Sequence, residues 1–420
     1  MALTREECEQ RDRDDPLAAL REQFLLPDGV IYLDGNSLGP LPRATGPAIE
    51  QLIAEQWGTD LIRAWNRHDW VNLPTRLGDL LAPLIGAGPG EVLVADSTSV
   101  NLYKVLTVAL RSTRAQHPER NVVVSERGNF PSDLYIADSV ASACGATLRL
   151  TGLGEDPLAA VDRQTAVLLL TQVDYRTGRL HDMSVVTAAA HASGVVVVWD
   201  LAHTAGVVPI HLVESDADFA IGCGYKFLNG GPGAPAFLWA NPHRPQSVLQ
   251  PIPGWFGHAV PFEFAVDYRP AAGVAAYQSG TPAVLSMVAL EHGIGTVLAA
   301  ERFGGLETLR AKSIALTELF IELVAPLGAS HGVHVASPLD SRQRGSQVSL
   351  THPEDAHAVV QALIDRGVIG DFRTPDIARF GFAPLYTRYV DVHDAATHLA
   401  DVLHSEAWRA PDYAVRSAVT

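Results

Sequence analysis

Short apolar runs alternate with stretches of helical periodicity from about residue 90 of this chain. The apolar runs predict buried strands at 91–94, 121–125, 146–150, 166–173, 195–199, 218–221 and 236–239. Helical patterns lie between them, at 100–111, 131–144 and 184–193. Continuous apolar strands separated by helices are typical of a mostly parallel sheet that is covered on both faces. The pattern therefore predicts a large α/β domain.

The pattern changes after Pro282, where the strict alternation of strand and helix ends. A long helical stretch is expected at 283–327, with strands at 347–350 and 377–382 and helices at 353–365 and from about Val392. We interpret this part as a smaller C-terminal α+β domain. A helix at 16–24 and a turn-rich stretch at 34–42 suggest an N-terminal arm that packs on the small domain. The expected boundaries are 1–60 for the arm, 61–285 for the large domain and 286–420 for the small domain.

Composition narrows the class of protein. The chain has 420 residues, 47% of them hydrophobic, and a formal net charge of −16, so its average field repels nucleic acid and anionic membranes. Its three cysteines form no CxxC pair, which disfavours a disulfide framework and a structural zinc site. The first residues are charged, and the apolar runs are of strand length. We expect a cytoplasmic enzyme that uses no metal and binds neither membrane nor nucleic acid.

Two strand ends carry candidate chemistry. The apolar run 195–199 ends at Asp200, and His203 follows three residues later. Lys226 follows the run 218–221 and precedes a glycine-rich turn at 230–233. Taken singly, Asp200 also fits a helix N-cap, and Lys226 also fits an ordinary surface lysine. In open α/β sheets, however, ligands bind at such strand ends.

Taken together, these residues predict a site for pyridoxal phosphate (PLP). Lys226 would hold the PLP aldehyde as a Schiff base, while the Asp200 carboxylate keeps the pyridine nitrogen protonated. The hydroxyl-rich segment 97–101 precedes a helix, and such a helix start binds phosphate, although serine and threonine also serve there as simple N-caps. Phe130 opens another helix, where an aromatic ring can stack on the cofactor or belong to the core.

Motifs along nearly the whole chain resemble the kynureninase family, its bacterial members most closely. The matching segments are 32–40, 57–58, 65–66, 96–102, 129–133, 173–178, 200–203, 224–229, 254–258, 279–282 and 379–386. The lysine and aspartate segments occur across a wider superfamily. The segments Gly-Asn-Ser-Leu-Gly at 35–39, Gly-Trp-Phe-Gly-His at 254–258 and Ala-Pro-Leu-Tyr at 383–386 are more specific to kynureninases.

The resemblance implies a fold and a reaction. The fold is that of the PLP-dependent fold type I enzymes, similar to aspartate aminotransferase, with a mostly parallel seven-stranded sheet and a smaller C-terminal domain. The reaction is the hydrolytic cleavage of the Cβ–Cγ bond of L-kynurenine, and possibly of 3-hydroxykynurenine. The products are anthranilate, or its 3-hydroxy form, and L-alanine, in tryptophan catabolism or NAD biosynthesis. A homodimer with active sites at the subunit interface is expected.

The resemblance also implies roles for individual residues. The catalytic residues are Lys226, Asp200 and Tyr225, the last as part of a proton relay. The cofactor-binding residues are Thr98, Ser99, Phe130, Asp133, Thr171, Asp200, His203, Tyr225, Lys226, Trp255 and Thr281, of which Trp255 and Thr281 are expected to act across the interface. The substrate-binding residues are Arg379, for the α-carboxylate, with Ser37, His68 and Phe256 as candidates for the aromatic end of the substrate, where Phe256 equally fits a place in the core. Arg373, six positions before Arg379, either shares the carboxylate or pairs with an acid.

Other classes of protein stay open at this stage. A related fold type I enzyme, such as a cysteine desulfurase or an aminotransferase, has the same lysine and aspartate. A desulfurase needs a mobile cysteine, however, and Cys223 is constrained by the strand end. A PLP-binding regulatory protein without turnover would lack a coherent set such as Arg379 and Tyr225. Metal-dependent hydrolysis is disfavoured because the histidines are scattered without HExxH spacing.

Overall fold

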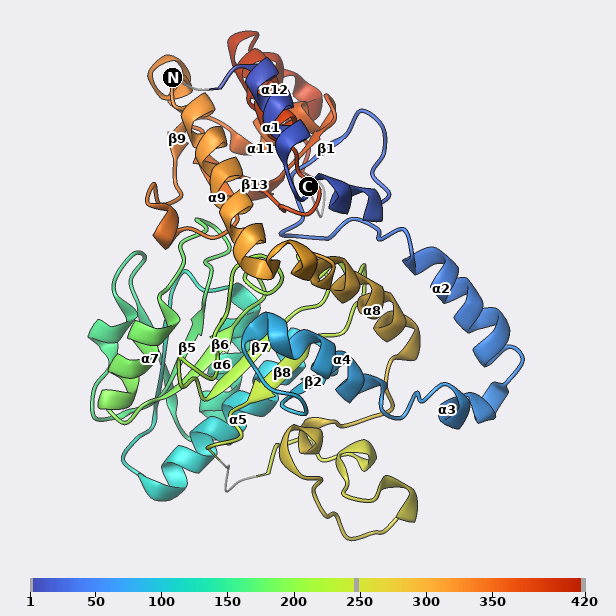
Figure 1. Ribbon diagram of the computed structural model, residues 1–420. Coiled ribbons are helices and arrows are strands. Elements are labelled where there is room, and N and C mark those ends of the chain that lie inside the picture. Colours follow the sequence, from blue (N-terminus) through green and yellow to red (C-terminus); the bar gives the residue numbers. More distant parts are fainter. Residues whose placement is uncertain (1–2, 245–248, 417–420) are drawn as a thin grey trace.

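A seven-stranded sheet lies at the centre of the larger part of the molecule (Figure 1). The computed structural model describes residues 3–244 and 249–416. The strands are β2 (Val92–Val94), β3 (Val122–Glu126), β4 (Thr147–Thr151), β5 (Thr165–Thr171), β6 (Val196–Asp200), β7 (Phe219–Gly222) and β8 (Phe237–Ala240). Their order is β2-β8-β7-β6-β5-β3-β4, and β8 alone in this sheet runs antiparallel to its neighbours. The expected mostly parallel sheet is confirmed.

Side chains alternate between the two faces of this sheet, as the pleat of a strand requires. Along β3, Val122 and Val124 belong to one hydrophobic cluster and Val123 to another, and Leu168 and Leu169 of β5 divide in the same way. The first cluster includes residues of α4 (Leu73–Leu81), α7 (Met183–Ala192) and α8 (Val284–Leu298), and the second those of α5 (Thr98–Gln116) and α6 (Pro131–Ala143). Helices therefore cover both faces, which explains why the strands read as continuous apolar runs.

The C-terminal part contains a second, antiparallel sheet of order β12-β13-β10-β9. These strands are β9 (His334–Val335), β10 (Gln347–Thr351), β12 (Asp371–Arg373) and β13 (Ile377–Gly381). Its helices are α9 (Gly305–Val324), α10 (Leu327–His331), α11 (Ala356–Ile364) and α12 (Tyr389–His404). The helical stretch expected at 283–327 is present, but it is divided into α8 and α9. Gly304 and Gly305 have φ of 101° and 65°, a left-handed backbone that separates α8 from α9.

The N-terminal arm differs from its expected form. The stretch expected as a helix at 16–24 forms only a short 3₁₀ turn, Ala18–Gln23, while a helix not expected from the pattern, α1, spans Arg5–Asp14. Of α1 only Cys8 is buried, so it shows no apolar face that a periodicity search could find. A capping box between Thr4 and Glu7 supports its start.

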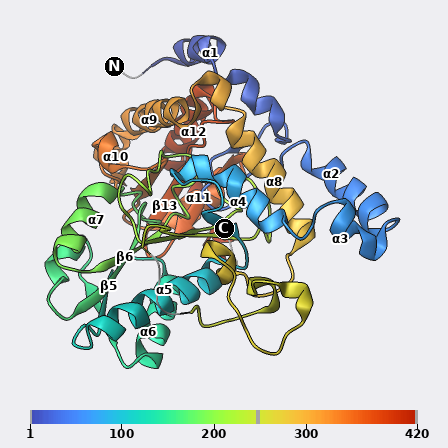
Figure 2. The same ribbon diagram turned by 60° about the horizontal axis from the view of Figure 1, so that its bottom comes forward.

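The arm contacts the C-terminal part along much of its length, through a helix and a strand among other contacts. α1 packs against α12, where the Asp12 carboxylate accepts from the backbone N–H groups of Tyr389 and Val390 at 2.7 and 3.0 Å (Figure 2). β1 (Ile31–Tyr32) pairs in parallel with β11 (Val368–Ile369). The short helices α2 (Thr45–Gln51) and α3 (Ala64–Arg67) follow along the edge of the large part. The domain boundaries given above stay a prediction.

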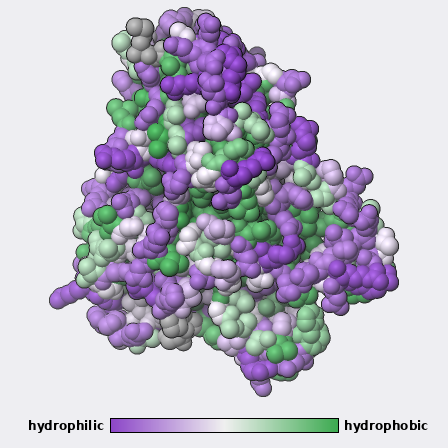
Figure 3. Space-filling view, viewed as in Figure 1, coloured by the Kyte–Doolittle hydropathy of each residue, from purple (hydrophilic) through white to green (hydrophobic). Residues whose placement is uncertain are grey.

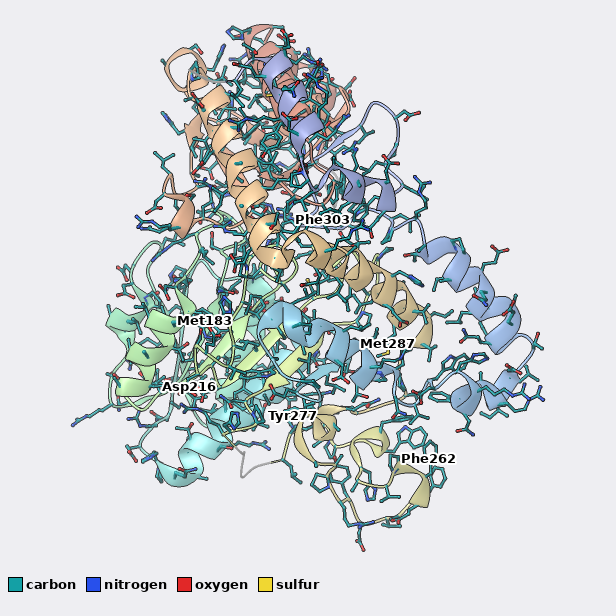
Figure 4. The ribbon with its side chains drawn as sticks, in the orientation of Figure 1. Met183, Asp216, Phe262, Tyr277, Met287 and Phe303 are labelled. Carbon is teal, nitrogen blue, oxygen red and sulfur yellow. The ribbon has the colours of Figure 1, made fainter. Side chains whose placement is uncertain are left out.

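An apolar lobe and a long apolar helical stretch are two further features of the fold. Residues 249–283, which precede α8, form a lobe that projects from the large part, with Phe262 at its outer edge, and apolar residues are exposed on this lobe (Figures 3 and 4). Phe262 and Phe264 are 55% and 73% exposed. The described residues also contain one helical stretch, Val284–Phe303, that is long and apolar enough to cross a membrane, which was not expected from the sequence. Length and composition alone are weak evidence, because core helices pass the same test, and Ile294 and Leu290 are buried in the main core.

Candidate active site

The carboxyl ends of the central parallel strands surround a cavity of about 160 Å³. Parallel pairing brings these ends together, since Thr171 at the end of β5 lies opposite Asp200 at the end of β6. Lys226 follows the neighbouring strand β7. The lining residues are Ser97, Thr98, Ser99, Phe130, Ser132, Asp133, Thr171, Tyr175, Asp200, Ala202, His203, Tyr225, Lys226, Ala234 and Ala236.

Lys226 is held at the cavity by His203, whose Nε2 lies 2.8 Å from Lys226 Nζ. Burial lowers the pKa of Lys226 and lowers the pKa of His203 well below its usual range. A neutral imidazole accepts at Nε2 the hydrogen bond that the lysine donates. The lysine nitrogen is therefore fixed in position and shifted towards its neutral, nucleophilic form.

Two carboxyl groups, those of Asp133 and Asp200, also line this cavity. Burial, and then the charge of Asp200, raises the pKa of Asp133 well above its usual range. Burial also raises the pKa of Asp200, but the Lys226 charge and the backbone N–H of Ala202, which donates to Asp200 Oδ1 at 2.7 Å, favour its carboxylate. Two close buried carboxyls do not both ionise easily, so Asp133 keeps its proton while Asp200 carries the negative charge.

The lining has the donor and acceptor groups that PLP requires. Within residues 3–244 and 249–416, Asp133 Oδ2 and His203 Nδ1 are buried polar atoms without a hydrogen-bond partner, and both residues border the cavity. Such atoms are costly unless a ligand or water satisfies them. A buried anion, a buried lysine and the hydroxyl-rich start of α5 match in turn the pyridine nitrogen, the aldehyde and the phosphate of PLP.

A cluster of two arginines lies next to this cavity. Both Arg379 and Arg373 are near enough to lower the pKa of Lys226 and that of His203 by their charge, after the larger effect of burial. Arg379 is 1% exposed and donates from Nη1 to the backbone oxygen of Tyr175 at 2.7 Å and from Nη2 to Ser37 Oγ at 2.7 Å. Tyr175 also contacts Phe130 edge to face, at 5.1 Å between ring centroids, so the cluster and the cavity share a wall.

The structure brings together most of the site residues expected from the sequence. The nine that line the cavity are Thr98, Ser99, Phe130, Asp133, Thr171, Asp200, His203, Tyr225 and Lys226. Phe130 is 42% exposed and its ring lies 5.8 Å from Lys226 Nζ, which suits an aromatic that covers a cofactor. Cys223 and burial raise the pKa of Tyr225, so its hydroxyl keeps its proton and acts as a donor.

Four expected residues lie elsewhere in this chain, and their roles stay predictions. His68 pairs with Asp60, at 2.9 Å between Nε2 and Oδ2, and Phe256 packs between Trp65 and Trp255. Trp255 is 40% exposed. Thr281 is exposed and lines a separate cavity of about 250 Å³, whose wall includes Asp96, Gly233 and Pro235.

Some residues of the site were not assigned a role from the sequence. Tyr175 and Ser132 line the cavity, and Asp371 binds both arginines. Tyr175 lies in the segment 173–178 that resembles the kynureninase family, which was an available signal. Asp371 stands two residues before Arg373, but only the pairing of β12 with β13 brings it to Arg379. Among the described residues, no group of three or more His, Cys, Asp or Glu side chains is arranged to hold a metal ion.

Comparisons with known proteins agree with this geometry. Solved structures with the same fold include a cysteine desulfurase from Thermococcus onnurineus, with 19% identity, a TM-score of 0.74 and coverage of 92% of this chain and 98% of that one. The cystine C–S lyase C-DES, solved with its product cysteine persulfide, has 19% identity, a TM-score of 0.74 and coverage of 89% and 98%. At these identities the likeness shows the fold, which is that of the PLP-dependent fold type I enzymes.

Sequence relatives are more specific. The family profile described as the kynureninase C-terminal domain matches residues 309–399. The kynureninases of Pseudomonas fluorescens and Burkholderia pseudomallei are each 49% identical over 419 residues, covering 99% of this chain and all of the relative. With its full length matched at this identity, the chain belongs to the kynureninase family.

Proposed function

We propose that this protein is a PLP-dependent hydrolase that cleaves the Cβ–Cγ bond of L-kynurenine to give anthranilate and L-alanine. The observation that carries the proposal is the cavity between Lys226 and Asp200, with the Arg379 cluster beside it. Lys226 and Asp200 match the groups of the cofactor, and the arginines can bind the carboxylate of an amino acid. The full-length likeness to kynureninases supports the choice of substrate.

Different residues of the cavity would bind different parts of the cofactor. Asp200 would pair with the pyridine nitrogen, Phe130 would cover the ring, and Thr98 and Ser99 would donate to the phosphate at the start of α5. Asp133, Thr171, His203 and Tyr225 complete the polar contacts. When bound, PLP supplies an electron sink that stabilises negative charge developing on the substrate carbons.

The substrate α-carboxylate would bind to Arg379. A guanidinium offers a planar pair of N–H groups that matches a carboxylate, and the low exposure of Arg379 strengthens such an ion pair. Ser37 already contacts this arginine and would adjust to the ligand. This contact orients the amino-acid end, which directs the Cα–H bond and the γ-carbonyl towards Lys226 and Tyr225.

Lys226 and Tyr225 would move the protons of the reaction. The lowered pKa of Lys226 lets its amine accept the Cα proton near neutral pH, and His203 holds Nζ in place meanwhile. Tyr225 keeps its hydroxyl proton and would donate it towards the γ-carbonyl oxygen as water adds there. We assign both residues as catalytic because Lys226 would act at the Cα proton and Tyr225 at the γ-carbonyl oxygen.

The aromatic end of the substrate and part of the phosphate would be bound with help from a second copy of the chain. Trp255, Thr281, Phe256 and His68 do not line the cavity of their own chain, and the projecting lobe that carries Trp255 exposes aromatic residues. A homodimer would cover this surface and bring Trp255 and Thr281 to the neighbouring site. We place such a dimer in the cytoplasm, in keeping with its acidic charge.

The test is the release of anthranilate, followed by its fluorescence, from L-kynurenine and the PLP-loaded protein. 3-Hydroxykynurenine is assayed on the same sample, because the site geometry does not rank the two substrates. Cleavage of neither substrate at full PLP occupancy would refute the proposal. A cysteine desulfurase is disfavoured as the alternative, since Cys223 is 2% exposed and its thiol donates to the Ala202 backbone oxygen at 3.7 Å.

A further inference from the structure

Asp371 is the point at which the donors of the arginine cluster meet. It lies directly opposite Arg379 in the antiparallel pair of β12 and β13. Its Oδ1 accepts from Arg379 Nε at 2.7 Å, and its Oδ2 accepts from Arg373 Nη2 and from Ser37 Oγ, each at 2.6 Å. Arg379 Nη2 also donates to this oxygen. One buried carboxylate thus binds three side chains, those of Arg379, Arg373 and Ser37.

These contacts fix the plane of the Arg379 guanidinium. Its Nε and Nη2 are bound along one edge by Asp371, and Nη1 is bound by the Tyr175 backbone oxygen at 2.7 Å. Arg379 Nη2 also donates to Ser37 Oγ at 2.7 Å, and Arg373 Nη2 donates to the same oxygen at 3.0 Å. An oxygen held between two guanidinium groups is what an incoming carboxylate would also provide.

The charges of the cluster are consistent with one anionic ligand. Two arginines and one aspartate leave one positive charge uncompensated. The neighbouring Asp34 does not cancel it at slightly acidic pH, because burial and then the charge of Asp371 raise the pKa of Asp34 to about 7. Asp371 itself stays ionised, since the charge of Arg379 and its hydrogen bonds outweigh the burial that opposes them and lower the pKa of Asp371.

We propose that Asp371 is a positioning residue for substrate binding, which orients Arg379 and Arg373 so that their free ends grip the α-carboxylate. This inference rests on the proposed function, in which Arg379 receives that carboxylate. It predicts that loss of the Asp371 charge weakens the binding of every ligand that carries an α-amino-acid carboxylate. The residues that bind the cofactor and Lys226 lie outside the cluster. The rates of proton transfer at Lys226 should therefore stay the same.

The experiment compares Asp371→Asn with the wild-type protein in KM and kcat for L-kynurenine. It also measures the affinity for L-alanine, followed by the change in PLP absorbance that its binding causes. Asp371→Asn should raise KM and the Kd of L-alanine about 10- to 100-fold, the effect of disturbing a charge-assisted hydrogen-bond pair. The value of kcat should change less than about 3-fold. Asp376→Asn is the matched control, because Asp376 lies on the same hairpin with a half-exposed side chain that pairs with Arg176 at 3.5 Å. It should leave all three values unchanged.

Asp371→Glu keeps the charge on a longer side chain and should give KM and Kd values between those of the wild type and of Asp371→Asn. It also carries the test if Asp371→Asn fails to load PLP. Unchanged or lower KM and Kd in the asparagine and glutamate variants would overturn the inference, and a fall would show that Asp371 competes with the ligand. An equal loss in kcat would mean general damage and would also overturn it. L-Alanine binding decides the question even if the wild type releases no anthranilate, an outcome that would refute only the proposed function.

Discussion

At the scale of single residues, the lysines are the clearest case of context changing an interpretation. The chain has three, Lys104, Lys226 and Lys312, and none of them is exposed. Lys104 Nζ is bound by Asp96 Oδ2 and the Tyr277 backbone oxygen, each at 2.6 Å. Lys312 pairs with Asp15 at 2.7 Å. The alternative of a solvated surface lysine is therefore wrong for Lys226, which alone of the three faces the cavity.

The first prediction concerns Lys226. Lys226→Ala should abolish the visible absorbance of PLP held by a lysine and lower anthranilate release on the order of 10³-fold or more, because a catalytic unit loses its central member. Lys312→Ala is the matched control, since burial lowers the pKa of Lys312 as well, yet it lies at an ion pair with the arm. It should keep the absorbance. If the band survived in Lys226→Ala, the assignment of this site would be wrong.

The second prediction concerns Asp34, whose pKa burial and the Asp371 charge raise to about 7. The unfolded chain releases this proton near pH 4, so between about pH 4 and 7 the native state binds more protons and loses stability as pH rises. Asp34→Asn removes this penalty. The difference in free energy of unfolding between Asp34→Asn and the wild type, measured with urea, should increase in favour of the variant by at most about 1.4 kcal/mol per pH unit up to pH 7. Above pH 7 this difference should stay constant.

The groups that face Asp34 come from several segments and set this window. They are Ser37 and Tyr32 from the arm, Asp371, Arg373 and Arg379 from the hairpin, and Tyr386. Burial and Asp371 raise the pKa of Asp34, and the charge of Arg379 and the hydrogen bond with Ser37 oppose this shift. A difference between Asp34→Asn and wild type that did not vary with pH would mean that Asp34 is ionised throughout.

At the scale of elements, the large part was predictable because its strands and helices have distinct periods. Every strand from β2 to β8 falls within two residues of its expected position, since each is an apolar run bounded by polar turns. The strands β1, β9, β11 and β12 were not expected, since strands of two or three residues carry too little pattern. α1 was missed because it is polar on nearly every face.

Some residues of the site could likewise be placed from the sequence, and others could not. Asp200, Lys226 and Thr171 could be placed from sequence because the ends of parallel strands converge. Tyr175 and Asp371 could not, since their roles arise from contacts between a loop after β5 and a hairpin in the C-terminal part. Periodicity carries no information about such pairings between distant segments.

The third prediction tests the start of α5 as the phosphate site. Thr98→Val removes one hydroxyl donor at this helix end and should raise the Kd for PLP about 10-fold, measured by fluorescence titration. Pyridoxal, which lacks the phosphate, should bind both proteins equally. Thr98→Ser keeps the hydroxyl and should restore PLP affinity. An equal loss for pyridoxal would place Thr98 away from the phosphate.

At the scale of the whole molecule, the exposed lobe and the unused site residues point to the same arrangement. Trp255 and Thr281 resemble phosphate-binding residues of the family, yet neither lines the cavity of its own chain. The cavity beside Thr281 is lined by Asp96 and Pro235, which are direct sequence neighbours of residues that line the Lys226 cavity, so the two cavities lie close together. A second copy that covers this side would complete the site.

The fourth prediction uses this shared site. Lys226→Ala and Thr281→Val should each be weakly active alone, because one lacks the lysine and the other weakens the phosphate contact. If Thr281 acts across the interface, a heterodimer contains one site that is wild type in both positions, and random re-association yields about a quarter of the wild-type sites. When the two variants are unfolded, mixed in equal amounts and refolded together, the mixture should release anthranilate at about a quarter of the wild-type rate. This activity is in addition to that of the Thr281→Val homodimers in the mixture. If Thr281 serves its own chain, each site in the mixture keeps a defect and no activity returns. The recovery thus distinguishes a site built by two chains from one that merely lies near an interface.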